Sequence, residues 1–243
     1  VWVRWSDVNN PANDWESMRS FFSSLAKTGI KGIKIDFMDS ASRERLAFYD
    51  AVAENLAKNK LMVNFHGANT PTGEERSWPH EMSREGIYGG EQNIWAAIGG
   101  RHYCALPFTR LVSGHADFTG GYFGHGPKLR GSSWPLQMAA NIIYTSPVLH
   151  WVSNPADMEA AFPKGSPERE AVRNIPSVWD ETIVLPPSAI GECAAFARRS
   201  GDQWYIALMN GDGRERTVSI PLDFLNRNTA YRATILRDLP EKN

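Results

Sequence analysis

Strand-like and helix-like segments alternate along the first part of the chain. Segments 1–5, 31–37 and 61–65 are rich in apolar, β-branched and aromatic residues, which predicts buried strands. Between them, segments 14–27 and 40–56 place apolar side chains at the spacing of one helix face, which predicts two helices. This alternation, at about 30 residues for each strand and helix, indicates a parallel sheet covered by helices.

The pattern continues less regularly through the middle of the chain. We expect strands at 86–91, 105–112 and 147–152, and a buried helix at 136–144. With the earlier strands these make six, whereas a (β/α)8 barrel is closed by eight parallel strands. The predicted fold class is therefore α/β, a (β/α)8 TIM barrel that lacks its first two strands in this chain.

After about residue 175 the helical pattern gives way to short alternating segments. Segments 190–199 and 204–209 flank a turn that contains Gly201, which predicts a β-hairpin. Segments 216–220 and 231–236 also alternate apolar and polar residues. We therefore predict two domains. Residues 1–174 would form the partial catalytic barrel (its strands 3 to 8), and residues 175–243 an incomplete C-terminal antiparallel β-sandwich domain.

The composition of the 243 residues is that of an ordinary globular protein, with 42% hydrophobic and 22% charged residues. The net charge is −1 with acids and bases intermixed, and no apolar run approaches the roughly 20 residues of a membrane span. We therefore expect neither a nucleic-acid partner nor a membrane. Nine tryptophans suit core packing, and they also suit sugar binding because pyranose rings stack on flat apolar rings.

Parallel barrels carry their catalytic groups at the carboxyl ends of the strands, and this rule selects among the charged residues. Asp36 ends the second predicted strand, and Lys34 lies two residues before it. Positions two apart on a strand share a face, so these side chains project together while Ile33, Ile35 and Phe37 project to the other side. A charge pair on a covered strand is costly without a purpose, which leaves a catalytic site or a structural ion pair as the alternatives.

Two more polar residues lie near the ends of predicted strands, and a third precedes one of them. His66 follows the third strand, and Glu91 follows Tyr88-Gly89-Gly90, whose glycines let the backbone turn sharply. Glu85 lies six residues before Glu91. Each of these residues by itself also suits an ordinary loop or surface position. Two carboxylates at one barrel mouth, Asp36 and Glu91, indicate glycoside hydrolysis, and the sequence leaves open whether the anomeric configuration is retained or inverted.

Several ordered motifs resemble those of glycoside hydrolase family 97. They are Lys31-Gly32-Ile33-Lys34-Ile35-Asp36-Phe37-Met38-Asp39, Val63-Asn64-Phe65-His66-Gly67-Ala68, Pro71-Thr72-Gly73, Ser83-Arg84-Glu85-Gly86, Leu106-Pro107-Phe108-Thr109-Arg110 and Pro176-Ser177-Val178-Trp179-Asp180-Glu181-Thr182. That family combines an N-terminal β-sandwich, a central (β/α)8 barrel and a C-terminal antiparallel β domain. The resemblance implies that this chain lacks the sandwich and the first two barrel strands.

Within the family, the chain resembles the retaining α-galactosidases more than the inverting α-glucosidases. The inverting group carries a base glutamate directly after the histidine that matches His66, and here that position is Gly67. The retaining group has a nucleophilic aspartate and an acid/base glutamate that match Asp36 and Glu91. The resemblance therefore implies these two catalytic residues, with Lys34 and His66 as substrate-binding residues.

The resemblance also implies a calcium ion beside the acid/base residue. Glu85 and Glu91 match two of its carboxylate ligands, and a further ligand would come from the N-terminal domain. Hard oxygen ligands suit Ca2+. The implied substrate is an oligosaccharide or an aryl α-galactoside. The implied location is bacterial, either periplasmic or secreted.

The leading hypothesis is thus a glycoside hydrolase that cleaves terminal α-galactosides with retention by double displacement. One alternative is an inverting α-glucosidase of the same family. Another is a sugar-binding fragment without catalysis, because an incomplete barrel leaves open sheet edges. A metal-dependent barrel enzyme of other chemistry would need more ligand residues than the sequence offers.

Overall fold

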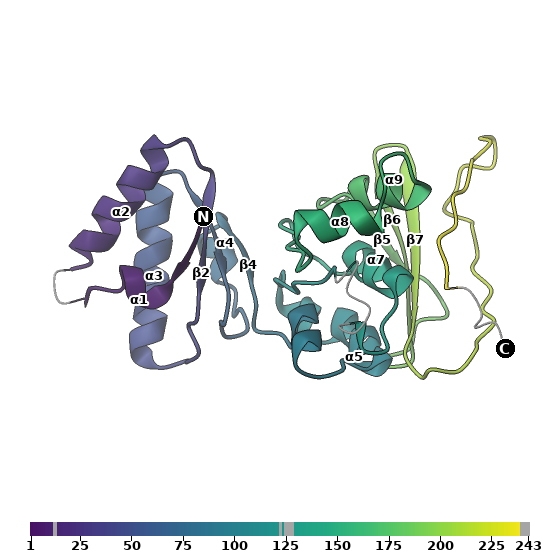
Figure 1. Cartoon of the computed structure of the whole chain (residues 1–243), viewed down its shortest axis with the longest axis horizontal. Coiled ribbons are helices and arrows are strands. Elements are labelled where there is room, and N and C mark those ends of the chain that lie inside the picture. Colours follow the sequence, from purple (N-terminus) through teal and green to yellow (C-terminus); the bar gives the residue numbers. More distant parts are fainter. Residues whose placement is uncertain (12–13, 122, 124–128, 239–243) are drawn as a thin grey trace. The chain divides into compact units, whose positions relative to one another are not determined.

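The computed structural model describes residues 1–11, 14–121, 123 and 129–238, which belong to two compact units (Figure 1). The first unit comprises Val1–Gly89, Arg110–Phe118 and Thr145–Val148. The second comprises Gly90–Thr109, Thr119–Tyr144 and the described part of Leu149–Asn243.

The first unit is built on a parallel sheet of four strands, which pair in the order β1-β2-β3-β4. The strands are β1 (Trp2–Arg4), β2 (Gly32–Asp36), β3 (Met62–Phe65) and β4 (Glu81–Arg84). The helices of this unit are α1 (Trp5–Val8), α2 (Glu16–Lys27), α3 (Arg43–Lys58) and α4 (Glu74–Ser77), and a short 3-10 helix η4 (Arg110–Ser113) follows later in the chain. The three expected strands and two expected helices of residues 1–65 are confirmed.

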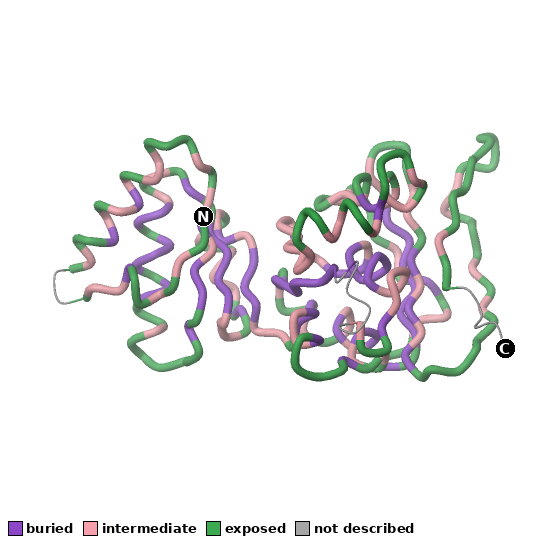
Figure 2. Tube along the Cα trace, viewed as in Figure 1, coloured by how far each residue is buried: buried purple, intermediate pink, exposed green. Residues whose placement is uncertain are grey.

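Helices α2 and α3 cover one face of the sheet, and the core of the unit lies between them and the strands (Figures 1 and 2). The sheet contributes Ile35 and Phe65, and the helices contribute Phe22 and Phe48, all fully buried. Ser42 begins α3 as its N-cap, where its side chain accepts a hydrogen bond from the amide of Arg45. Burial of apolar surface is the main stabilising term for such a layer, because sheet and helices each offer one apolar face.

Strand β2 alternates as expected up to its last residue. Ile33 and Ile35 are buried against the helices, whereas Lys34 and Asp36 lie on the opposite face. The expectation that Phe37 continues the apolar face is wrong. The strand ends at Asp36, and Phe37 takes a φ of 63° with 44% of its surface exposed. The left-handed conformation breaks the alternation and turns the ring toward solvent.

The fourth strand was not expected at its observed position. Segment 86–91 is not a strand, and β4 instead spans Glu81–Arg84. This strand carries three polar residues out of four, so it lacks the apolar alternation by which strands are recognised in a sequence. Its polar residues are nevertheless buried, because Arg84 and Glu81 pair with each other.

The second unit combines short helices with an antiparallel sheet. Its helices are η2 (Gly90–Ile94), α5 (Gly100–Ala105), η3 (Leu106–Phe108), α7 (Trp134–Ile143), α8 (Pro155–Ala161) and α9 (Pro167–Arg173). The expected buried helix is confirmed as α7. The strand expected at 105–112 is wrong, because these residues form the end of α5 and the turns η3 and η4. A short apolar run does not by itself distinguish a strand from a buried helix.

A further strand of the expected barrel is also missing from the described residues. In place of the strand expected at 147–152, Trp151 forms one isolated parallel bridge with Gly120. The parallel sheet therefore has four strands in the described part of the chain, fewer than the six expected. What the structure shows directly is an α/β unit with a parallel sheet.

The C-terminal sheet has the antiparallel order β5-β6-β7, with β5 (Glu181–Val184), β6 (Cys193–Ser200) and β7 (Gln203–Asn210). Ser200 pairs with Gln203 around a two-residue turn, so the expected hairpin is confirmed. Segments 216–220 and 231–236, although described, are not strands. The boundary expected at residue 174 stays a prediction. Among the described residues, no helix is long and apolar enough to cross a membrane.

Arg84 should be essential to the stability of the first unit. Its side chain is 1% exposed, and the guanidinium donates to both carboxylate oxygens of Glu81 at 2.7 and 3.0 Å and lies over the Tyr49 ring. Arg84→Lys keeps the charge but loses the two-point contact, so we expect the free energy of unfolding to fall by about 2 kcal/mol or more. Chemical denaturation followed by circular dichroism measures the change.

Arg76 on the exposed side of α4 offers a matched control. Arg76→Lys should change the free energy of unfolding by less than about 0.5 kcal/mol. Equal effects of the two substitutions would show that the buried pair does not stabilise the unit.

Candidate active site

Three of the expected site residues lie at neighbouring strand ends in the first unit. Asp36 ends β2, His66 follows β3, and Glu85 follows β4. The parallel pairing continues one residue past the last two strands, because the His66 amide donates to Ile35 and the Glu85 amide donates to Phe65, both at 2.8 Å. The carboxyl ends of these strands therefore bring an acid, an imidazole and a second acid to one edge of the sheet.

The carboxylate of Asp36 is held in one orientation by two donors. The indole Nε1 of Trp2 donates to Oδ2 at 2.9 Å, and the amide of Phe37 donates to Oδ1 at 2.6 Å. Asp36 is 8% exposed, so it is shielded from bulk water. A carboxylate whose two oxygens are both held by fixed donors is pre-oriented, which suits a group that must approach a reacting atom from one direction.

The turn after β2 has an uncommon backbone that supports this arrangement. Both Phe37 and Asp39 have positive φ angles, 63° and 45°. The amide of Asp39 donates to the carbonyl of Gly67 at 2.7 Å, which joins this turn to the one after β3. Left-handed non-glycine residues are sparsely populated and are concentrated at functional sites, so the strain is consistent with a site at this edge.

Lys34 pairs with a residue that sequence inspection did not select. Its ammonium donates to Oδ2 of Asp117 at 2.8 Å, so the ion pair considered between Lys34 and Asp36 is replaced by a longer-range one. Asp117 is fully buried and lies between the buried apolar residues Ala116 and Phe118. An acid inside such an apolar run was the one local signal that could have drawn attention to it.

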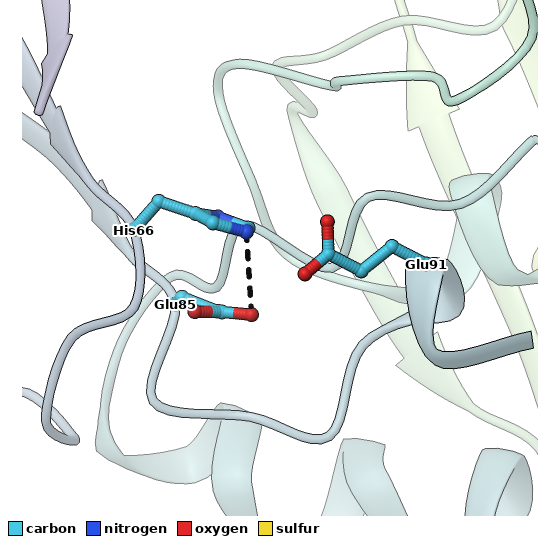
Figure 3. Close-up of side chains that lie close together, drawn as sticks. All are labelled: His66, Glu85 and Glu91. Carbon is cyan, nitrogen blue, oxygen red and sulfur yellow. Dashed lines mark ion pairs between the residues drawn. The ribbon is translucent and has the colours of Figure 1, made fainter. Parts of the chain in front are cut away.

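His66 lies between two carboxylates. Its Nδ1 is 2.9 Å from Oδ2 of Asp117, and its Nε2 is 3.4 Å from Oε1 of Glu85 (Figure 3). His66 and Glu85 are both buried. The ring is therefore held at both nitrogens, which fixes its plane relative to the strand ends.

Gly67 occupies a position where a side chain would be crowded and the backbone strained. Its φ is 57°, and a Cβ built there would come within 3.1 Å of the backbone of Phe37 and of Oδ1 of Asp39. Its amide donates to Oε2 of Glu85 at 2.5 Å. Glycine is favoured here both by the left-handed backbone and by the close approach of the neighbouring turn.

Arg110 holds the backbone around Glu85. Its guanidinium donates to the carbonyls of Arg84, Glu85 and Gly86 at 2.7, 2.9 and 2.8 Å. Burial, together with the nearby charge of Arg84, lowers the pKa of Arg110 to about 10. These donations from a partly buried cation to backbone carbonyl groups help to define the path of the chain after β4.

Glu91 belongs to the second unit. It lies in the first turn of η2 and is half-buried. The expectation that it ends a strand is wrong, because Gly89 and Gly90 lead into a 3-10 turn. Its expected role as the acid/base residue stays a prediction.

The two cysteines lie in the second unit as free, buried thiols. Burial raises the pKa of Cys104 to about 11, so its thiol stays protonated at neutral pH. Burial thus disfavours a nucleophilic thiolate at Cys104.

Comparison with known proteins identifies matching families at both ends of the chain. A family model described as glycoside hydrolase 97 matches residues 1–87. A second model, described as the oligomerisation region of the glycosyl-hydrolase 97 C-terminus, matches residues 178–243. Together the two models match more than half of the chain.

Two curated relatives match almost the whole chain. A probable retaining alpha-galactosidase of Streptomyces bingchenggensis is 34% identical over 91% of this chain and 33% of its own length. A retaining alpha-galactosidase of Bacteroides thetaiotaomicron is 31% identical over 97% of this chain and 36% of its own length. The chain thus spans about a third of the length of the curated relatives that it matches.

Solved structures share the fold. A family 97 enzyme of Pseudoalteromonas sp. in complex with panose superposes with a TM-score of 0.78 at 23% identity, over 93% of this chain and 38% of that one. A beta-arabinopyranosidase superposes with a TM-score of 0.69 at 26% identity, over 79% of this chain and 32% of that one. With both family models, the curated relatives and the folds in agreement, the chain belongs to glycoside hydrolase family 97.

Proposed function

We propose that this chain is part of a retaining α-galactosidase in which Asp36 is the nucleophile. One observation carries the proposal. Asp36 ends a parallel strand with both carboxylate oxygens held by donors, from Trp2 and from the amide of Phe37. The names of the curated relatives support the same activity. We further propose that the parallel sheet is part of a (β/α)8 barrel and that the C-terminal sheet is part of a β-sandwich.

Gly67 supports retention over inversion. Family resemblance places the base of the inverting enzymes at this position, and here a Cβ would come within 3.1 Å of the Phe37 backbone. Any residue with a side chain would also have to adopt a φ of 57°, a conformation that non-glycine residues populate sparsely. The local backbone is therefore suited to glycine, and position 67 carries no carboxylate that could act as the inverting base. Of the two acids at this edge, Asp36 is the proposed nucleophile and Glu85 the proposed calcium ligand.

The proposed reaction is a double displacement. Asp36 attacks the anomeric carbon of a terminal α-galactoside and forms a covalent glycosyl-enzyme, while Glu91 donates a proton to the leaving oxygen. Glu91 then takes a proton from water, which attacks the anomeric carbon and releases Asp36. The two inversions together retain the α configuration.

Lys34 and His66 would bind the substrate beside the nucleophile. Lys34 shares the sheet face of Asp36, and its ammonium has three N–H donors, of which Asp117 accepts one. The remaining donors suit sugar hydroxyls. His66 lies at the next strand end and would contribute a polar contact from the neighbouring position.

A calcium ion is part of this proposal. Glu85 is a buried carboxylate at a strand end, and oxygen ligands of this type fit Ca2+. Glu85 and Glu91 would hold the ion, which when bound supplies positive charge that stabilises developing negative charge near the leaving group. The N-terminal β-sandwich that would supply a further ligand stays a prediction. The bacterial periplasmic or secreted location also stays a prediction.

Replacing the nucleophile should abolish turnover in a way that a small anion can rescue. Asp36→Ala should lower kcat for an aryl α-galactoside roughly 10³-fold or more, because no covalent intermediate can form. Azide fits the space left and attacks from the same side, so added azide should restore part of the rate and give β-galactosyl azide. Absorbance of the released phenol and NMR of the sugar product measure both effects.

Asp50→Ala, at an exposed position of α3, is the matched control and should keep full activity. Full activity of Asp36→Ala would contradict the role of Asp36. Loss of activity without rescue by azide would count against the covalent mechanism.

The anomer formed first distinguishes retention from inversion. When the intact protein hydrolyses an aryl α-galactoside, α-galactose should appear first and then mutarotate, because two displacements restore the configuration. Proton NMR of the anomeric region during the first minutes records this order. Initial β-galactose would contradict the retaining mechanism. Preferential turnover of α-glucosides would favour the inverting relatives. Sugar binding without turnover would identify a non-catalytic protein.

Chelation tests the proposed calcium ion. Treatment of the intact protein with EGTA should lower activity, and added Ca2+ should restore it, because the proposed ligands are hard carboxylate oxygens. Glu85→Gln should raise the Ca2+ concentration that gives half-maximal recovery, whereas Glu54→Gln on the exposed surface of α3 should leave it unchanged. Activity that is indifferent to both EGTA and Ca2+ would exclude a functional calcium.

A further inference from the structure

The buried carboxylate of Asp117 joins two residues that lie on different strands. Its Oδ2 is 2.8 Å from the ammonium of Lys34 and 2.9 Å from Nδ1 of His66. Asp117 lies 83 residues after Lys34 and 51 residues after His66 along the chain. One oxygen atom therefore couples the face of β2 to the end of β3.

The backbone around Asp117 is anchored independently of these two contacts. The amide of Ala116 donates to the carbonyl of Thr145 at 3.1 Å, and the carbonyl of His115 accepts from Arg110 at 3.3 Å. Ala116 and Phe118 are both buried. The position of Asp117 is thus set by its neighbours, and the carboxylate acts as a fixed point for Lys34 and His66.

A fixed acceptor restricts both partners. A lysine side chain has four rotatable bonds, and a hydrogen bond to a buried carboxylate selects one of its arrangements. An ionised carboxylate only accepts hydrogen bonds, so the His66 ring must carry a proton on Nδ1 to bond Asp117. Nε2 is then directed toward Glu85, 3.4 Å away (Figure 3).

We propose that Asp117 is a positioning residue that holds Lys34 and His66 in the arrangement needed to bind the sugar beside Asp36. The inference rests on the proposed function, since it assigns Lys34 and His66 to the substrate. Asp117 itself acts through these two side chains and not through the substrate. A purely structural ion pair would stabilise the fold without affecting how Lys34 serves catalysis.

A double-substitution cycle separates positioning from a structural role. In the intact protein, Asp117→Asn keeps the shape of the side chain but removes its charge. It should lower kcat/KM for an aryl α-galactoside roughly 10- to 100-fold, because misplaced binding groups cost about that much. Lys34→Met should cause a comparable loss. In the Lys34→Met background, Asp117→Asn should lower kcat/KM by less than about three-fold, because the group on which it acts is gone.

Asp50→Asn on the exposed surface of α3 is the matched control, and its kcat/KM should equal that of the unmodified protein. Losses that multiply in the double variant would show that Asp117 does not act through Lys34 and would overturn the proposal. An Asp117→Asn variant with unchanged kcat/KM would overturn it as well.

A second measurement needs neither activity nor a folded variant of Asp117. In the unmodified protein labelled with 15N-histidine, the His66 signals, assigned by comparison with His66→Gln, should show a proton on Nδ1. An unprotonated Nδ1 would overturn the proposal. If the unmodified protein fails to hydrolyse α-galactosides while Nδ1 carries its proton, the proposed function fails and the arrangement of His66 by Asp117 stands.

Discussion

The parallel hydrogen-bond ladder of β1 to β4 is the constraint on which the candidate site depends. It pairs Ile35 with Phe65 and Phe65 with Arg84, so the ends of β2, β3 and β4 lie level with one another. A slip of one residue would turn Lys34 and Asp36 toward the helices and Ile35 toward the site face. The apolar core and the polar site therefore enforce the same register, because each occupies the face that the other cannot use.

Buried charges at this edge are tolerated because each one has a partner. Arg84 pairs with Glu81 inside the unit, and Asp117 pairs with Lys34 and His66. Taking such groups out of water carries a large desolvation cost, and the contacts offset it only when the geometry is good. What these pairs provide is order: the side chains near Asp36 are held by fixed partners before any substrate arrives, which is the condition for stabilising a transition state without rearrangement.

The fold alone does not decide the chemistry of this family. Similar folds occur in a beta-arabinopyranosidase and in a family 97 enzyme found in complex with panose. The activity must therefore be argued from the strand ends, where the crowded backbone at Gly67 disfavours a side chain and Trp2 orients the carboxylate of Asp36. Each feature is a single residue: Gly67 affects the site through the local backbone, and Trp2 through the orientation of a carboxylate.

The sequence by itself determined the elements with a clear apolar period: the strands β1 to β3, the helices α2, α3 and α7, and the hairpin of β6 and β7. It also placed Asp36, Lys34 and His66 near the ends of their strands, because strand ends follow from the same alternation. Glu85 was singled out only by the resemblance to family 97, since its strand was not expected at the observed position. Only the tertiary structure decided the position of β4, whose polar residues carry no such signal. It also decided the contacts of Trp2 with Asp36 and of Asp117 with Lys34, which join residues 34 and 83 positions apart. Local periodicity reports which face of an element is buried, whereas such pairings depend on how distant segments meet in the folded chain.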